Sequence, residues 1–573
     1  MCHAVVRTTL DLRVRQRGSV HNHDSGSAQG VIIRRSSVLF LSLVMIVSPG
    51  WCSDEHHHQL TQEALGSVHF LTSCSRSVER GFNRAVALLH SFQYEQARQA
   101  FAEVLNQDPH CAMAQWGVAM SQYHGLWDSG DMMEGREALH AAERIAAANP
   151  ATTDREKAYI DALAEIYRDD SDNGLVHAQA FERKMGALQA AYPTDSEAAI
   201  FHALTLYITA STADKTFSNQ RKCGQILEPI FEKQPHHPGV AHYIIHCYDN
   251  PALAQRALSA ARMYAKIAPA SAHANHMPSH IFTRVGSWEE SISSNVKSAE
   301  LAAKAESTST NGEARDQRLH ALDYLEYAYL QSGHMKEADK VLDEMRTLHP
   351  VAGLTLVGDY ALAAIPARHA MELGNWKQAA ELEVRREGLP WAQAITWTAI
   401  GVGSARLGEV NRASQAEETL ASLRDATAKQ GNVYWASQIE VQRREVAAWL
   451  AQTTGKTADA IAAIRSAAEL EESMEKHPVT PGPVTPAREM LAQLLALQGR
   501  NHESVAEYEA VLRVAPNRFD ALYGVASAAE KSGDPARARQ YFEKLSQIAV
   551  GNERQEVATA RQKLAGTADR QPD

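Results

Sequence analysis

The sequence lacks the short motifs that identify most common enzyme classes. Its 573 residues contain only six cysteines, and none of them stands in a CxxC or CxxCH pattern. The sequence therefore lacks the motifs that identify zinc-ribbon, thioredoxin-like and c-type haem sites. The patterns GxGxxG, GxSxG and HExxH are absent as well, and with them the usual signs of dinucleotide binding, serine hydrolysis and zinc proteolysis. The motifs leave open whether the chain is an enzyme.

Long hydrophobic runs are scarce. One apolar run, residues 38–47, follows Arg34-Arg35 and precedes the small residues Ser48 and Gly50. It is too short for a comfortable transmembrane helix, but its flanks are typical of an export leader. We therefore expect cleavage after Gly50 and a periplasmic or secreted mature protein. A membrane contact is expected only if this leader stays uncleaved.

A concentration of positive charge is also missing. The formal net charge is −11, and no stripe of lysine and arginine follows the leader. Because nucleic-acid surfaces need such a basic footprint, we expect no nucleic-acid partner.

What the sequence does contain is an internal repeat. Each unit has a helix with small residues midway, a turn with glycine, a second helix with alanine and aromatic positions, and a proline. The turn glycines of these units are Gly333, Gly374, Gly408, Gly499 and Gly533. The pattern resembles the tetratricopeptide repeat (TPR) family over nearly all of residues 75–565. This resemblance implies an all-α, right-handed solenoid of roughly nine to ten helix pairs.

Breaks in the repeat pattern indicate a domain organisation, and the Pro-rich stretch His477-Pro478-Val479-Thr480-Pro481-Gly482-Pro483 is the most convincing boundary. The expected segments are a leader (1–50), a lead-in tail (51–74), an N-terminal solenoid (75–350), middle repeats (351–476), a linker (477–485), a C-terminal repeat pair (486–565) and a disordered tail (566–573).

Histidines recur at the period of the repeat in the centre of the chain. His242 and His276 lie 34 residues apart, and so do His246 and His280. This separation is one TPR period. Within each pair the two histidines are four residues apart, which places them on one face of a helix on successive turns.

By resemblance to the TPR family, three adjacent first helices present these side chains to one concave groove. The candidate metal ligands are His242, His246, His273, His276, His280, His320 and Asp323. Imidazoles with one carboxylate suit zinc, copper, iron or nickel, and the sequence does not choose among them. A polar groove for a peptide and structural histidines are the alternatives.

Several other residues are candidates with a structural alternative. Tyr243, Tyr327, Trp116 and Met113 fall near groove positions and are candidate ligand contacts, although core packing also explains Trp116 and Met113. His69 and Cys74 reach the groove if their segment folds back, whereas the alternative is a helix cap with Phe70 closing the end of the array. Cys223 and Cys247 either form a disulfide or are buried as small apolar residues.

The segments His-Pro-Gly-x-x-His-x-x-x-His and His-Met-Pro-Ser-His-Ile also resemble a group of poorly characterised exported bacterial and fungal TPR proteins, over roughly residues 66–330. The sequence thus predicts an exported TPR binding protein whose groove holds a metal ion or a polar ligand. Two alternatives remain open at this stage: a metal-dependent hydrolytic or oxidative enzyme, and a protein–protein adaptor without metal.

Overall fold

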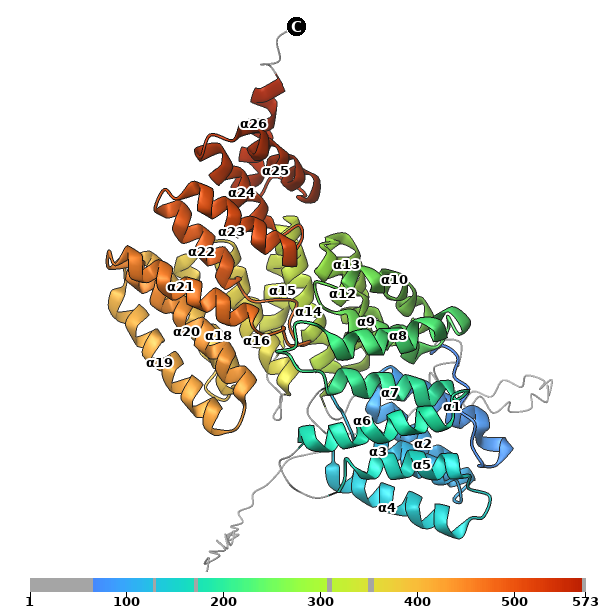
Figure 1. The fold of residues 1–573 in the computed structure, drawn as a ribbon. Helices are drawn as coiled ribbons and strands as arrows, with labels where there is room; N and C mark the ends of the chain where they lie inside the picture. Colours follow the sequence, from blue (N-terminus) through green and yellow to red (C-terminus); the bar gives the residue numbers. More distant parts are fainter. Residues whose placement is uncertain (1–64, 127–129, 169–173, 307–311, 349–354, 569–573) are drawn as a thin grey trace, which may run out of the picture. The chain divides into compact units, whose positions relative to one another are not determined.

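The computed structural model describes residues 65–126, 130–168, 174–306, 312–348 and 355–568, and within these ranges the regular elements are all helices (Figure 1). Successive helices pack on one another along the chain, as α1 does on α2 and α18 on α19. The expected leader and most of the lead-in tail lie outside the described residues. The fold is an all-α solenoid of TPR-type helix pairs, as the repeat pattern predicts.

The first part of the array precedes the histidine-rich centre. Its elements are η2 (Arg76–Val78), α1 (Glu79–His90), α2 (Tyr94–Gln107), α3 (Ala112–Met120), α4 (Met132–Ala148), α5 (Asp154–Ala164), α6 (Gly174–Ala191), α7 (Ser196–Ile208) and α8 (Ser218–Lys233). These helices share one hydrophobic core with the helices that follow, up to Phe282.

The central part carries the repeated histidines. Its elements are α9 (Pro238–Tyr248), η3 (Ala254–Ala257), α10 (Leu258–Ile267), α11 (Ala272–His276), α12 (Pro278–Val285), α13 (Trp288–Glu306), α14 (Glu313–Ser332), α15 (Met335–Thr347) and α16 (Leu356–Glu372). The expected single helix through His276 and His280 is divided into α11 and α12, because Pro278 has no backbone N–H to continue the first segment.

The last part of the array follows α16. Its elements are α17 (Trp376–Ala380), α18 (Pro390–Leu407), α19 (Val410–Lys429), α20 (Val433–Thr453), α21 (Thr457–Glu472), α22 (Ala487–Leu497), α23 (Asn501–Val514), α24 (Phe519–Lys531), α25 (Pro535–Ile548) and α26 (Gln555–Ala568). Helix α26 continues past residue 565, where the sequence predicts that the ordered repeats end.

Glycine and other small residues act where the repeat pattern needs them. Gly333 and Gly408 follow the last residues of α14 and α18 in the left-handed backbone conformation, with φ of 77° and 82°. Residues that have a Cβ atom rarely adopt this conformation. Gly524 of α24 lies against the ring of Tyr508 of α23. A Cβ atom on residue 524 would lie only 2.3–2.6 Å from atoms of that ring, so the two helices pack this closely only because the residue is glycine.

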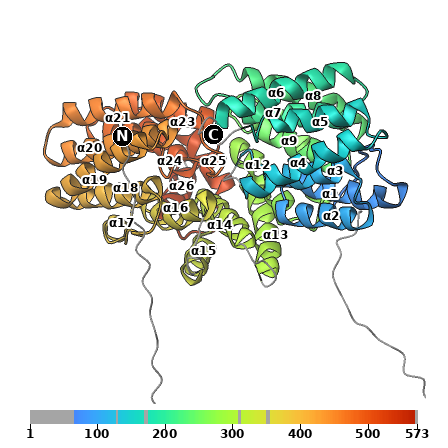
Figure 2. The same ribbon diagram turned by 90° about the horizontal axis from the view of Figure 1, so that it is seen from below.

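The array also makes contacts between helices distant in the sequence. Helix α1 packs on α9, and α14 packs on α24. The indole of Trp288 donates to the carbonyl of Asn517 (2.9 Å), and the side chain of Asn517 donates to the carbonyl of Gly286 (3.1 Å). Figure 2 shows the helices of the C-terminal part beside α14 and α16 in a second view. These contacts go beyond the neighbour-only packing of a simple solenoid.

Residues 475–486, which we call the strap, connect α21 to α22 across the central helices. Tyr324 of α14 donates to the carbonyl of Thr480 (3.0 Å), and Arg368 of α16 donates to the carbonyl of Pro483 (2.8 Å). The ammonium of Lys476 lies 2.9 Å from the carboxylate of Asp249. The predicted linker thus packs against helices far away in the sequence. The domain boundaries themselves stay predictions.

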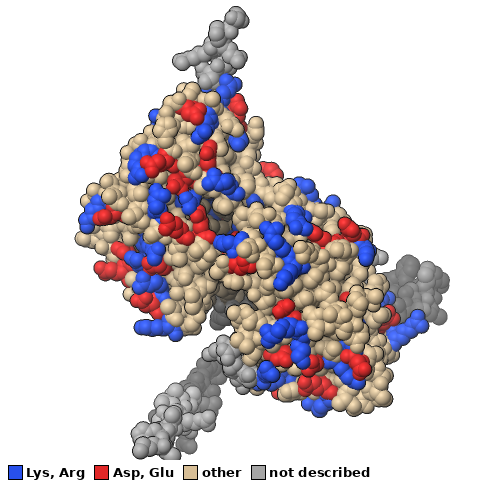
Figure 3. All heavy atoms as spheres, viewed as in Figure 1, with Lys and Arg blue, Asp and Glu red and all other residues tan. Residues whose placement is uncertain are grey.

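Among the described residues, two disulfides connect elements of the N-terminal half, Cys74–Cys111 and Cys223–Cys247. For Cys223 and Cys247, the structure therefore has the disulfide and not the alternative of two separate buried thiols. The first disulfide joins Cys74 to Cys111 at the start of α3, while Phe70 packs on Phe82. None of the described helices combines the length and apolar character of a membrane span. On the face drawn in Figure 3, basic and acidic side chains are interspersed.

Candidate metal centre

Six histidines from α9, α11, α12 and α14 gather in the interior of the central part. Their side chains are only 0–6% exposed: His242, His246, His273, His276, His280 and His320. The sequence-based expectation that repeated histidines converge is confirmed by this arrangement. The expectation of an open groove is wrong, because the cluster is buried.

The first group of three is formed by His242, His246 and His273. The Nε2 atom of His242 lies 3.0 Å from Nε2 of His246 and 3.0 Å from Nε2 of His273. The Nδ1 atom of His242 donates to the carbonyl of His90 (2.7 Å). Since a neutral imidazole has one N–H, this bond leaves a lone pair on the Nε2 atom of His242, facing its two neighbours.

The second group of three is formed by His276, His280 and His320, whose ligand atoms all lie within 4.8 Å of one another. The Nδ1 atom of His276 donates to Oδ1 of Asn295 (2.6 Å). The Nδ1 atom of His280 donates to Oδ2 of Asp249 (2.9 Å). Hydrogen bonds of this kind orient a metal-ligating imidazole and fix its tautomer.

These hydrogen bonds leave two unprotonated nitrogens of the second group facing each other. Because His276 and His280 both use Nδ1 as a donor, both Nε2 atoms carry lone pairs. The two Nε2 atoms are 3.0 Å apart. Two lone pairs at this distance repel each other unless a cation lies between them. For comparison, two nitrogens bound at 2.0–2.1 Å to a tetrahedral metal ion are about 3.3 Å apart.

Burial keeps the six imidazoles neutral. Desolvation lowers the pKa of His242, His246, His273, His276 and His320 well below the ordinary value, and neighbouring histidines lower it further. Burial also lowers the pKa of His280, although Asp249 opposes this. Neutral imidazole is the form that binds metal ions.

The carboxylate of Asp249 is the main charged group behind the second group. Burial opposes its ionisation, but Lys476, Arg284 and His280 outweigh that effect and hold the pKa of Asp249 well below its usual range. Nε of Arg284 donates to Oδ1 (2.8 Å) while His280 and Lys476 contact Oδ2. The ionised carboxylate accepts hydrogen bonds only, which confirms the direction of the bond from His280.

The two groups of three lie next to each other. The ring centres of His246 and His280 are 6.2 Å apart, and those of His273 and His276 are 6.4 Å apart. Tyr324 packs against the second group, with its ring centre 4.8 Å from those of both His276 and His280. The six histidines therefore form one continuous centre, which we call the six-histidine centre.

A third cluster has a different structure. Glu197 accepts hydrogen bonds from Nε2 of His90 (2.9 Å) and from Nε2 of His237 (2.8 Å). The Nδ1 atom of His90 accepts from the hydroxyl of Tyr243 (2.9 Å), and that of His237 accepts from the backbone N–H of Val240 (3.3 Å). Every ring nitrogen has a protein partner, so this cluster is a closed hydrogen-bond network.

Phe92 covers the first group from the turn between α1 and α2. Its ring centre lies 4.4 Å from that of His242, and it also contacts the rings of His246 and His273. Its φ is 53°, in the left-handed region that disfavours residues with a bulky side chain. Most of the other described residues with positive φ are glycines, although Phe217 and Asn517 share this conformation. The conformation of Phe92 places its ring over the histidines of the first group.

The remaining sequence candidates lie elsewhere. Asp323 joins neither group: its carboxylate lies 3.6 Å from Nε of Arg368, and burial raises its pKa to about 6 although Arg368 opposes this. Trp116 and Met113 are in the hydrophobic core instead of along a groove. Tyr327 is 4% exposed and lies below the guanidinium of Arg368.

Sequence reasoning missed the residues that surround the histidines. Asp249 and Asn295 follow no repeat period, and they reach the centre only because α9 and α13 pack beside α12 and α11. Lys476 comes from the strap and lies 227 residues after its partner Asp249 along the chain. For Phe92 a signal was present, because an aromatic residue replaces the usual turn glycine.

Residues 489–550 match the tetratricopeptide repeat family, a stretch that runs from α22 to the end of α25. A search of curated protein sequences finds no match. Among solved structures, the yeast Tom70 aligns over 71% of this chain and 96% of its own, with 10% identity and a TM-score of 0.29. The human IFIT1 dimer with PPP-AAAA aligns over 80% of this chain and 94% of its own, with 11% identity and a TM-score of 0.31. Alignments this loose carry no conclusion about ligands.

Proposed function

We propose that this chain is an exported TPR-repeat binding protein that holds transition-metal ions in its six-histidine centre, one ion for each group of three. The observation that carries the proposal is the pair of Nε2 lone pairs on His276 and His280, 3.0 Å apart. A metal ion between them, with His320 as the third ligand, converts this repulsion into coordination.

The donor set limits the kind of metal. Three neutral imidazoles without a thiolate or carboxylate suit zinc, copper, iron or nickel and do not suit magnesium or calcium, which prefer oxygen ligands. Asn295 and Asp249 supply the outer hydrogen bonds that hold the two rings in place. Three protein ligands leave a coordination position for a further ligand.

Export and protein binding are parts of the same proposal. The disulfides Cys74–Cys111 and Cys223–Cys247 support an oxidising compartment, where such bonds persist. The TPR match at residues 489–550 supports a protein partner, since repeats of this kind form extended binding surfaces.

A metal-dependent enzyme is the second candidate, and the neighbouring position of the two groups favours it. The ring centres of His246 and His280, one from each group, are 6.2 Å apart. Ions bound in neighbouring groups could act together on one substrate, as in enzymes with two metal ions. Turnover of a substrate by the loaded protein, and its loss in variants of either group, separates this candidate from a binding protein.

The test is the metal content of untagged protein. We expect zinc, copper, iron or nickel in stoichiometric amounts by mass spectrometry, and loss of at least the second ion in the variant His276→Ala/His280→Ala. The matched control is His110→Ala, since His110 is exposed on the surface. Protein that stays free of these metals after incubation with each of them contradicts the proposal.

A further inference from the structure

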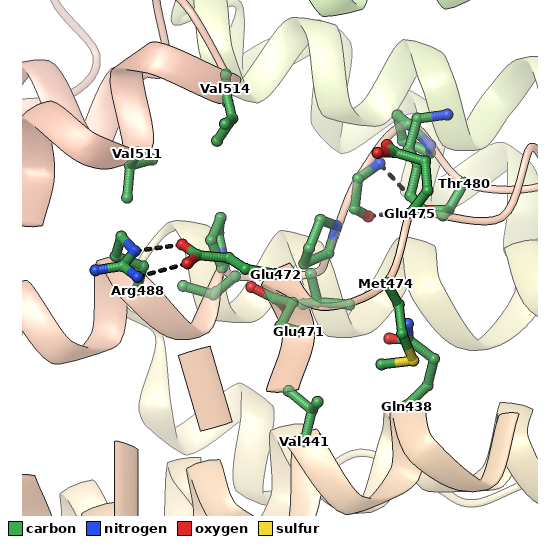
Figure 4. Close-up of a pocket in the computed structure, with 18 of the residues that line it drawn as sticks. Gln438, Val441, Glu471, Glu472, Met474, Glu475, Thr480, Arg488, Val511 and Val514 are labelled. Atoms are coloured by element: carbon green, nitrogen blue, oxygen red, sulfur yellow. Dashed lines mark hydrogen bonds and ion pairs between the residues drawn. The ribbon is translucent and has the colours of Figure 1, made fainter. Parts of the chain in front are cut away.

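A cavity of about 660 Å³ lies between α18, α20, α21, α23 and the strap. This volume is in the range of sites for small molecules. The strap is a shared wall, because Thr480 lines the cavity and its carbonyl also holds Tyr324 beside the six-histidine centre. Figure 4 shows Glu475 and Thr480 on one side of the cavity and the ion pair of Glu472 with Arg488 on the other.

Glu445 is the unusual residue of this cavity. It projects from α20, is 4% exposed and forms no hydrogen bond or ion pair with the described residues. Gln442, one turn earlier, also lines the cavity, and its buried Oε1 atom has no hydrogen-bond partner. Buried acceptors without donors are rare in proteins, and each one calls for an explanation.

Glu471 adds a second carboxylate, from α21. One of its oxygens accepts from the backbone N–H of Ala487 (3.1 Å). Burial raises the pKa of Glu445 and that of Glu471, the latter to about 7, and the proximity of Glu471 raises the pKa of Glu445 further. Neither carboxyl group forms an ion pair with a described residue, although Arg518 and Arg488 oppose the rise in the pKa of Glu471.

The basic residues that line the cavity form no ion pair with Glu445 or Glu471. Four of them are paired with other carboxylates: Lys215 with Glu475, Arg284 and Lys476 with Asp249, and Arg488 with Glu472. The fifth, Arg513, is exposed at the edge.

Part of the cavity wall is aromatic. Trp391 and Trp435 are stacked with ring centres 4.5 Å apart, and Tyr360 packs beside them at 6.2 Å from each. All three line the cavity. Aromatic faces attract organic cations, and carboxylates bind the N–H groups of protonated amines.

From these features we infer that the cavity is a binding site for a small aliphatic diamine or polyamine, held by Glu445, Glu471 and Gln442 against the aromatic wall. The amine N–H groups meet the acceptors of Glu445 and Gln442 that lack donors, and the positive charge of the amine meets the carboxyl groups of Glu445 and Glu471, which form no ion pair. The inferred site does not require the metal, because none of the six histidines lines the cavity.

The test compares hexane-1,6-diamine and spermidine with hexane-1,6-diol, which has the same six-carbon chain as the diamine but no charge. Binding is measured by calorimetry and by the fluorescence of Trp391 and Trp435. We expect both amines to bind and the diol not to bind. No binding of either amine at millimolar concentration, or equal binding of the diol, overturns the inference.

Variants locate the site. Glu445→Gln and Glu471→Gln each reduce amine affinity at least about tenfold, the scale of one lost charged hydrogen bond. Glu469→Gln is the matched control on the exposed side of α21 and keeps the affinity of the wild type. Because Glu445 has no partner, its replacement leaves the melting temperature unchanged or higher, which shows that the variant is folded. His276→Ala/His280→Ala retains amine binding. Unchanged affinity in both glutamate variants contradicts the site.

Discussion

The six-histidine centre and the His90–Glu197–His237 network lie close together in the same core, yet they use histidine in opposite ways. In the network, Glu197 accepts from both Nε2 atoms, and both Nδ1 atoms accept in turn. In the second group of the centre, the Nδ1 atoms of His276 and His280 are the donors, so the Nε2 atoms face each other unprotonated. The difference depends on which ring nitrogen the protein engages.

This contrast teaches that clustering of histidines is not by itself a sign of a metal site. Both regions are buried, and both bring three potential ligands within reach of one ion. Of the two regions, only the six-histidine centre brings two unprotonated nitrogens together, the Nε2 atoms of His276 and His280. A useful criterion is therefore the outer hydrogen-bond partner of each imidazole, because it decides where the lone pair points.

Replacing a single histidine ligand, in either group of three, has the largest expected effect on metal binding. His242→Ala removes one metal equivalent and leaves the other, and His276→Ala does the reverse. Each loss exceeds a hundredfold in affinity, because even outer partners contribute about 10–100-fold. Metal content per chain and titration with a competing chelator measure it. If His242→Ala removes both ions, the two groups act as one site.

Removing an outer partner has a smaller effect. Asn295→Ala takes away the acceptor of the His276 Nδ1 atom, so the ring loses its orientation, and we expect binding to the second group to weaken by about 10–100-fold. Asn275→Ala is the matched control, because Asn275 is equally buried but donates to the carbonyls of Pro269 and Ser271. Equal weakening in both variants indicates a general packing defect instead.

Breaking the closed network affects stability and not metal content. Glu197→Gln places an amide where two N–H donors point, so we expect a loss of about 1–3 kcal/mol in the free energy of unfolding. Burial opposes ionisation of Glu197, but His237 and His90 outweigh it and hold its pKa well below the ordinary 4.5.

A carboxylate with a depressed pKa stabilises the fold above its unfolded pKa and loses this contribution as the pH falls. The difference in stability between wild type and Glu197→Gln therefore narrows below about pH 4.5. Chemical denaturation between pH 3 and 7 measures it. A loss of metal from Glu197→Gln would place the network among the metal sites.

The smallest effect is expected at Asp323, which the sequence nominates as a ligand. Asp323→Asn leaves the metal affinity within about twofold, because its carboxylate is beside Arg368 and belongs to neither group of three. Calorimetric titration with the bound metal checks this. A marked loss of affinity would show that Asp323 moves to the metal when it binds.

Much of the candidate site was predictable from the repeat. A separation of 34 residues between His242 and His276 places both at the same position of successive units, and the spacing of four brings His246 and His280 to the same faces. The third members, His273 and His320, follow from the same phase. Asp323 occupies an equivalent position in its repeat as well, but Arg368 of α16 packs beside it. That contact cannot be inferred from the spacing of residues in the sequence.

The sequence alone determined the helix-pair repeat and the convergence of its histidines. Both the turn of a helix and the repeat of the array appear in the sequence as fixed spacings between residues. The tertiary structure decided whether those histidines are open or buried, which nitrogen of each ring faces its neighbours, and which distant segments surround them. Hydrogen-bond partners such as Asp249 and Asn295, and the strap with Lys476, come from packing between elements whose separation follows no period.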